Sequence, residues 1–147
     1  MGTTYNKGNK MILPSEELLS EILDIEEGYI ELARCDKDST ICYQYTRNAN
    51  TEDESIEYHF VNIYELAHKV KEWALTQELV PNFPYIIYSS PYEKKVVGKT
   101  IMGHDIVEFY PSAWIYNLVG NKKEFHADTE PEAIFQAGEL ILKKHTK

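Results

Sequence analysis

The chain has 147 residues, of which 43% are hydrophobic and 12% aromatic, and its formal net charge at pH 7 is −9. This composition predicts one folded domain and excludes wholesale disorder, and no apolar run approaches the roughly 20 residues of a membrane-spanning helix. The acidic balance argues against direct nucleic-acid binding, which needs clustered Lys and Arg. Because the first residues also lack the apolar stretch of a secretory signal, we expect a cytoplasmic protein that does not bind membranes.

The first expected element is a short helix behind a flexible N-terminal tail. Residues 1–11 have no pattern and are assigned to the tail, and residues 12–147 to a single α+β domain. Ser15 predicts the start of the helix, because its hydroxyl can cap the first turn and the acids that follow it favour the helix dipole. The helix is expected to end before Gly28, and its apolar positions are Leu18, Leu19, Ile22 and Leu23.

Acidic residues are concentrated in the first part of the chain. Residues 1–61 carry 13 acids and 5 bases, a balance of −8, whereas residues 62–147 carry 11 acids and 10 bases, a balance of −1. Glu17, Glu21 and Asp24 are spaced so that one helix face can carry all three. One hypothesis is that the acids of 15–31 and 52–57 imitate the phosphates of nucleic acid and inhibit a host defence protein. The alternative is a solvated acidic helix.

A β-hairpin is expected next, with strands at 29–35 and 41–46 and a polar turn at 36–39. Cys35 and Cys42 fall within these strands. Their spacing matches no common zinc or redox motif, so both are expected to be small apolar strand residues.

A third strand at 56–61 follows an exposed acidic loop at 48–55 and leads directly into a helix over 62–77. Asn62 can cap this helix, and Glu65 occupies the reciprocal position of a capping box. Its apolar positions recur at helical spacing: Ile63, Leu66, Ala67, Val70, Trp73 and Ala74.

Pro81 and Pro84 end this helix and open a second β stretch. Strands are expected at 85–88, 95–102, 106–110 and 113–119, with Pro111 and Ser112 between the last two. A hairpin turn at 120–122 then leads into a strand at 123–127.

A final helix begins in the stretch D-T-E-P-E at 128–132. Thr129 is the expected cap, Pro131 suits the first turn, and Glu132 completes a T-x-x-E capping box. The buried positions of this helix are Ala133, Ile134, Ala137, Leu140 and Ile141.

Residues 57–75 and 124–142 align without a gap, and five of the 19 aligned positions are identical. This similarity predicts a duplicated strand–helix unit, with a coincidence of two capped amphipathic helices as the alternative. The expected fold is an α+β two-layer sandwich of antiparallel strands and about three helices. Alternation in the third strand predicts that Tyr58 and Phe60 face the helices, whereas His59 faces away.

The repeat also pairs two histidines, each with a glutamate two residues before it. If His59, His126, Glu57 and Glu124 met, they could bind a metal ion or a small ligand. The alternative is two exposed strand histidines that never meet. Because the sequence contains no G-x-S-x-G, P-loop, G-x-G-x-x-G, H-E-x-x-H or C-x-x-C motif, we expect no enzymatic activity and no cofactor.

Three segments resemble those of small uncharacterised proteins carried by bacterial phages and prophages: LPSEELLSEIL at 13–23, NIYELAHKVKEWAL at 62–75 and ADTEPEAIFQAGELIL at 127–142. The resemblance implies a phage-type accessory protein and no particular activity. Many tyrosines fall in the expected strands, and tyrosine is favoured at protein interfaces. The expected partner is therefore a host or phage protein, and the sequence leaves self-association open.

Overall fold

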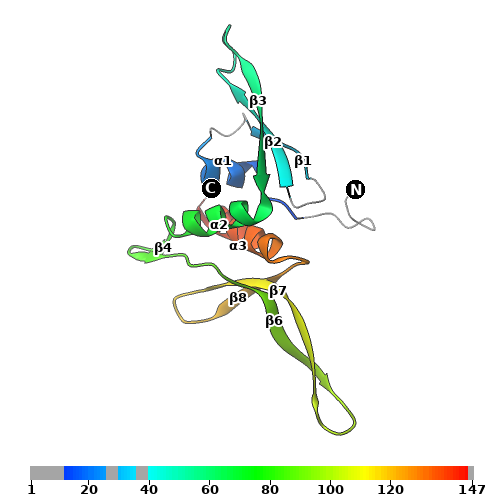
Figure 1. Ribbon diagram of the computed structural model, residues 1–147. Helices are drawn as coiled ribbons and strands as arrows, with labels where there is room; N and C mark the ends of the chain where they lie inside the picture. Colours follow the sequence, from blue (N-terminus) through cyan, green and yellow to red (C-terminus); the bar gives the residue numbers. More distant parts are fainter. Residues whose placement is uncertain (1–11, 26–29, 36–39, 146–147) are drawn as a thin grey trace.

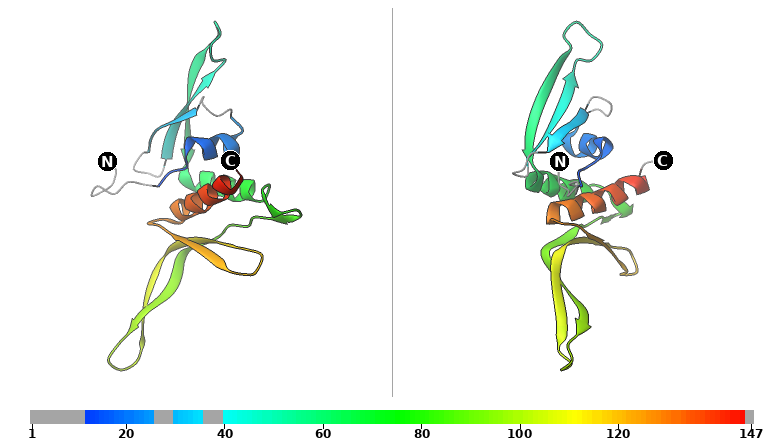
Figure 2. Two further views of the ribbon diagram at one scale, coloured as in Figure 1. Left: turned by 180° about the vertical axis from the view of Figure 1, so that it is seen from behind. Right: turned by 90° about the vertical axis from the view of Figure 1, so that its right-hand side faces the viewer.

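A computed structural model describes residues 12–25, 30–35 and 40–145 of the chain. The tail expected at 1–11 lies outside the described residues. Three helices lie in the middle of the molecule, and two β-hairpin arms extend from them in opposite directions (Figure 1). The other two views show the same elongated shape (Figure 2).

The first half of the chain contains two of the helices and one of the arms. Its elements are α1 (Glu16–Leu23), β1 (Ile30–Cys35), β2 (Thr40–Arg47), β3 (Ser55–Asn62) and α2 (Ile63–Ala74). The three strands make an antiparallel sheet in the order β1-β2-β3. The hairpin of β2 and β3, here called the β2–β3 arm, carries the acidic loop at its tip, and β3 leads straight into α2.

The second half contains the third helix and the other arm. Its elements are β4 (Glu78–Val80), β5 (Phe83–Pro84), β6 (Tyr88–Lys99), β7 (Asp105–Tyr116), β8 (Lys122–His126) and α3 (Glu130–His145). Strands β6, β7 and β8 make a second antiparallel sheet in that order. The long hairpin of β6 and β7 is here called the β6–β7 arm.

The same order of elements therefore occurs twice, as three antiparallel strands followed by a helix. Strand β3 precedes α2 as β8 precedes α3, which is the unit that the sequence alignment predicted. The α+β class, the antiparallel strands and the three helices are confirmed. The two three-stranded sheets lie one on each side of the helices (Figures 1 and 2), and β4 and β5 pair in a separate two-stranded sheet.

Side chains cap the helices at the predicted residues. Ser15 Oγ accepts the backbone N–H of Leu18 at 3.1 Å, and Asn62 Oδ1 accepts that of Tyr64 at 2.8 Å. Thr129 accepts the N–H of Glu132 and donates its hydroxyl to the Glu132 carboxylate at 2.8 Å. The local sequence is therefore sufficient to start each helix.

The core lies where the helices contact one another and the bases of both sheets. Helices α2 and α3 pack together, α1 contacts both of them, and α3 also covers β6, β7 and β8. The largest fully buried hydrophobic side chains of this core are Leu18, Leu19, Ile30, Ile41, Ile63, Leu66, Val70, Phe135 and Ile141. Residues of both halves share one core, so neither sheet is covered without the helices.

Two acids of α3 hold the segment that precedes α1. Glu132 is buried, and its second oxygen accepts the backbone N–H of Ile12 at 2.8 Å. Glu139 accepts both the backbone N–H and the hydroxyl of Ser15, at 2.6 and 2.9 Å. Charged acceptors make strong hydrogen bonds, so these carboxylates fix α1 against α3.

Several strand predictions were wrong in extent. The strands expected at 106–110 and 113–119 merge into β7, which runs through Pro111. Proline is tolerated there because β6 bulges between Ser90 and Glu93 and β8 ends opposite Ser112, so no ladder hydrogen bond needs its N–H. The predicted strand at 85–88 is irregular until Tyr88.

The predicted orientation of β3 was also wrong. Tyr58 and Phe60 are each 60% exposed, whereas the corresponding Phe125 and Ala127 do pack against the core. On β2, the partner of His59 is Tyr43, which is buried, so this side of the sheet faces the core. Helix α2 ends at Ala74, three residues earlier than predicted, because the chain turns into β4.

Candidate functional site

The structure does not bring the two candidate histidines together. His59 lies on β3 and His126 on β8, in separate sheets on opposite sides of the helices. The His59 ring stacks on Tyr43 with centroids 5.2 Å apart, and the His126 ring meets the edge of Tyr110 at 4.7 Å. Within residues 12–25, 30–35 and 40–145, no three histidine, cysteine or acidic side chains are grouped as metal ligands.

The two glutamates are engaged by cations. Arg47 Nε donates to Glu57 at 2.6 Å, and His59 Nε2 lies 3.2 Å from the same carboxylate. The hydrogen bond from Arg47 lowers the pKa of Glu57, and the hydrogen bond to His59 acts in the same direction. Glu124 pairs with Lys122 at 3.2 Å. These contacts make both glutamates members of surface ion pairs rather than free metal ligands.

The described acids of the mimicry hypothesis do not form one surface. Glu17 and Glu21 are exposed on α1, but Asp24 lies beyond the helix, as a left-handed C-cap with φ 56°. Glu21 also accepts a hydrogen bond from Trp73 Nε1 at 3.3 Å. The acidic loop is at the far tip of the β2–β3 arm, away from α1 (Figure 1). The described charges of 15–25 and 52–57 are therefore spread over separate parts of the surface, and Glu26 and Glu27 lie outside the described residues.

Both cysteines lie in strands, as predicted. Cys42 is a free, buried thiol in β2, and Cys35 is the last residue of β1. In the strand register Cys42 is opposite Arg34 and Cys35 is opposite Ile41. A small apolar role is thus confirmed for Cys42.

A cluster of aromatic rings covers the outer side of the second sheet. Ala113 and Ile115 of β7 are buried, so the alternating residues Trp114 and Tyr116 face outward. Tyr88 pairs with Trp114 in the register, and their rings stack at 6.1 Å, whereas the Tyr116 ring meets Tyr88 edge-on at 5.7 Å.

Lys122 of β8 completes this cluster. Its ammonium lies 4.6 Å from the centroid of the Trp114 ring and forms ion pairs with Glu124 at 3.2 Å and Glu93 at 3.7 Å. Partial burial lowers the pKa of Lys122, but the two carboxylates outweigh it and raise that pKa overall. Tyr88, Trp114, Tyr116 and Lys122 are here called the aromatic face. Their contacts with one another fix the rings while much of Tyr88 and Tyr116 stays exposed.

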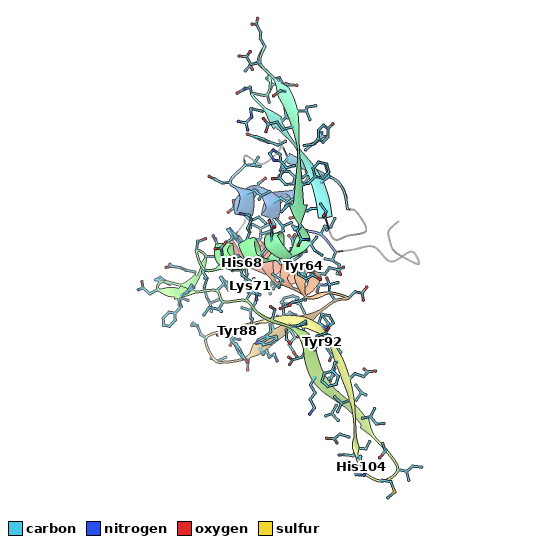
Figure 3. All side chains as sticks on the ribbon, viewed as in Figure 1. Tyr64, His68, Lys71, Tyr88, Tyr92 and His104 are labelled. Atoms are coloured by element: carbon cyan, nitrogen blue, oxygen red, sulfur yellow. The ribbon has the colours of Figure 1, made fainter. Side chains whose placement is uncertain are left out.

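The β6–β7 arm continues this surface away from the core. Figure 3 places Tyr88 near the base of the arm and His104 at its tip. Its exposed apolar side chains are Tyr92, Val96, Val97, Ile101, Met102, Ile106 and Phe109. Ile101 is fully exposed, so folding of the chain gives it no packing contact with the core.

A cleft of about 410 Å³ opens between β4, the β7–β8 turn and the end of α3. Its lining is mostly apolar and includes Leu79, Ile115 and Ile141 together with Lys123 and Lys144. Among its described lining residues there is no carboxylate, histidine, cysteine or serine. The described lining therefore combines apolar contact area with lysine, tyrosine and asparagine side chains.

No family model, curated protein or solved structure matches the chain. Over the described ranges, none of the helices is both long and apolar enough to span a membrane.

The sequence predicted an interface role for the tyrosines of the strands but did not show which of them cluster. The strand expected at 113–119 contains the alternation that turns Trp114 and Tyr116 to one side. Their contact with Tyr88 depends on the pairing of β6 with β7, and their contact with Lys122 depends on β8. Pairing registers of this kind are set by bulges and turn lengths that the sequence pattern does not resolve.

Proposed function

We propose that the protein is a non-enzymatic, cytoplasmic accessory protein of phage type that binds another protein through the aromatic face. The observation that carries this proposal is the contact geometry of Tyr88, Trp114 and Tyr116 on the uncovered side of a sheet. Tyrosine and tryptophan dominate the binding energy of protein interfaces, because they bury a large area and lose few rotamers. Binding costs conformational entropy when it orders side chains at the interface. Rings that already pack on one another lose less of this entropy.

The charges around the rings favour a protein over a nucleic acid as the partner. Nucleic-acid surfaces of this type combine stacking rings with unpaired cations that neutralise phosphates. Here the cation of Lys122 is matched by Glu93 and Glu124. An aromatic centre beside a cation that is already paired with carboxylates is instead typical of a protein interface, whose rim is polar.

The test is capture of a partner from an extract of the cells in which the protein occurs. The wild-type chain should retain a saturable protein partner, and the double variant Tyr88→Ala with Trp114→Ala should lose it. Each hot-spot truncation costs at least about 2 kcal/mol, or roughly a 30-fold weaker affinity.

Phe83→Ala is the matched control, because Phe83 is an exposed aromatic residue on β5, outside the aromatic face. It should bind as the wild type does. Equal capture by the double variant and by Phe83→Ala, with both folded by circular dichroism, would refute the aromatic face as the binding surface.

A further inference from the structure

Strand edges in the described part of the molecule differ in how well they are protected from pairing with other chains. In natural proteins, a bulge, a proline, a lysine or a short length keeps an edge strand from pairing with a strand of another chain. Strand β1 has a register irregularity between Leu32 and Arg34. Strand β6 contains Pro91 and two irregularities, and β8 has only five residues and starts with Lys122 and Lys123.

Strand β3 has none of these protections. It has eight residues, Ser55 to Asn62, with no proline or lysine, and its register with β2 is continuous. Among the described strands only β2 pairs with it, so its other edge presents unpaired backbone groups. An edge of this length without protection is a template for another strand.

The same strand carries an exposed apolar stripe. Ile56, Tyr58 and Phe60 alternate along it, and each is at least half exposed. On the other side of the strand, Glu57 and His59 are partly exposed, at 32% and 43% of their side chains. The side chains of Ile-Glu-Tyr-His-Phe therefore alternate between apolar and polar, in a pattern symmetric about Tyr58.

We propose that β3 pairs with β3 of a second copy of the chain, antiparallel about a two-fold axis at Tyr58. The two three-stranded sheets then join into one continuous sheet. Such an interface is isologous, because the same patch is used by both copies.

Two features select this register: the side of the sheet on which the apolar stripes lie, and the residue that lies opposite Glu57. Residues that pair across two strands point to the same side of the sheet. The two apolar stripes therefore share a side only if the sequence numbers of paired residues differ by an even number. A centre at Glu57 would place two like charges opposite each other, which is destabilising. A centre at Tyr58 instead places Glu57 opposite the second copy's His59, and Ile56 opposite the second copy's Phe60.

Strand β3 runs from the tip of the β2–β3 arm to α2 (Figure 1). In the proposed register the second copy's Asn62 lies opposite Glu54, so its α2 begins beside the tip of the arm. The pairing lies on the opposite side of the helices from the aromatic face (Figure 2). It is therefore independent of the proposed function, and variants of the aromatic face should not change it.

Sedimentation velocity over a range of concentrations tests the pairing. The wild type should shift from one to two chain masses as concentration rises. Tyr58→Lys should stay at one chain mass, because the axis brings its two ammonium groups together. The matched control is Thr46→Lys, which adds the same charge on the same side of the sheet but on β2, opposite Ile56; it should dimerise normally. A wild type that stays monomeric, or equal dimerisation of both lysine variants, overturns the proposal.

Cysteine cross-linking tests the register and does not depend on the fold of Tyr58→Lys. In a background of Cys35→Ser and Cys42→Ala, Tyr58→Cys alone should form a disulfide-linked dimer on oxidation. Ile56→Cys and Phe60→Cys should each stay unlinked, and a mixture of the two should give a linked heterodimer. Linkage of Ile56→Cys to itself, or no linkage at Tyr58→Cys, overturns the register.

Discussion

Gly138 determines how closely α3 approaches the other two helices. A Cβ atom at this position would lie 2.6 Å from Val70 Cγ1 and 3.2 Å from Leu18 Cδ2. Gly138→Ala gains about 1 kcal/mol in helix propensity but overpacks the core at a cost of about 1–3 kcal/mol. We expect a net loss of about 1 kcal/mol in the free energy of unfolding, measured by urea denaturation. Adding Val70→Ala should make the combined loss smaller than the sum of the two single losses, since the new methyl group fills the space. Strictly additive losses would contradict the close approach.

At the scale of single residues, the sequence predicted what local chemistry decides. Ser15, Asn62 and Thr129 cap the helices as expected, because an N-cap hydrogen bond involves only neighbouring residues. The orientation of Tyr58 was predicted wrongly. Alternation shows which residues of a strand share a side, but not which side the rest of the chain covers. The prediction that His59 and His126 form one site was wrong because equivalent positions in two repeats need not be near each other.

At the scale of elements, Glu132 links two segments that are far apart in the sequence. Glu132 is buried, and its carboxylate accepts hydrogen bonds from the Thr129 hydroxyl and from the backbone N–H of Ile12. Glu132→Ala leaves the Ile12 N–H without its acceptor and should lower the free energy of unfolding by about 1–3 kcal/mol. Amide hydrogen exchange should rise first in α1, which follows that segment. Glu132→Gln is the control and should cost less, because its amide oxygen can still accept from Ile12 and its NH₂ can donate to Thr129. Equal losses for the two variants would show that the hydrogen bonds are unimportant.

The helices and the third strand could be predicted because their apolar periodicity is long and regular. The separation of the two three-stranded sheets could not, because each three-stranded unit has the same local pattern whether it joins its neighbour or not. The merging of two predicted strands into β7 across Pro111 depended on the bulge in β6 opposite it. A bulge of that kind is a property of the strand pair and not of either sequence alone.

For the molecule as a whole, stability is concentrated in the helices and the bases of the sheets. The core contains Tyr85, Ile87, Ala113 and Ile115 from the second half but no residue of the β6–β7 arm between 88 and 112. A two-stranded hairpin with no covering element adds little stability in water. The arm therefore extends the molecular surface without contributing to the core.

This distribution predicts the effect of shortening the β6–β7 arm. Replacing residues 94–109 by Asn-Gly joins Glu93 to Tyr110, which are already partners in the register, through a turn suited to a hairpin. We expect a thermal midpoint within a few degrees of the wild type, measured by circular dichroism, because no buried side chain is removed. Phe135→Ala is the contrasting variant, since Phe135 is fully buried in α3 and its truncation should cost about 3–5 kcal/mol. The shortened chain keeps the aromatic face, so any binding that it loses is due to the apolar side chains of the distal arm. A shortened chain as unstable as Phe135→Ala would show that the arm belongs to the cooperative core.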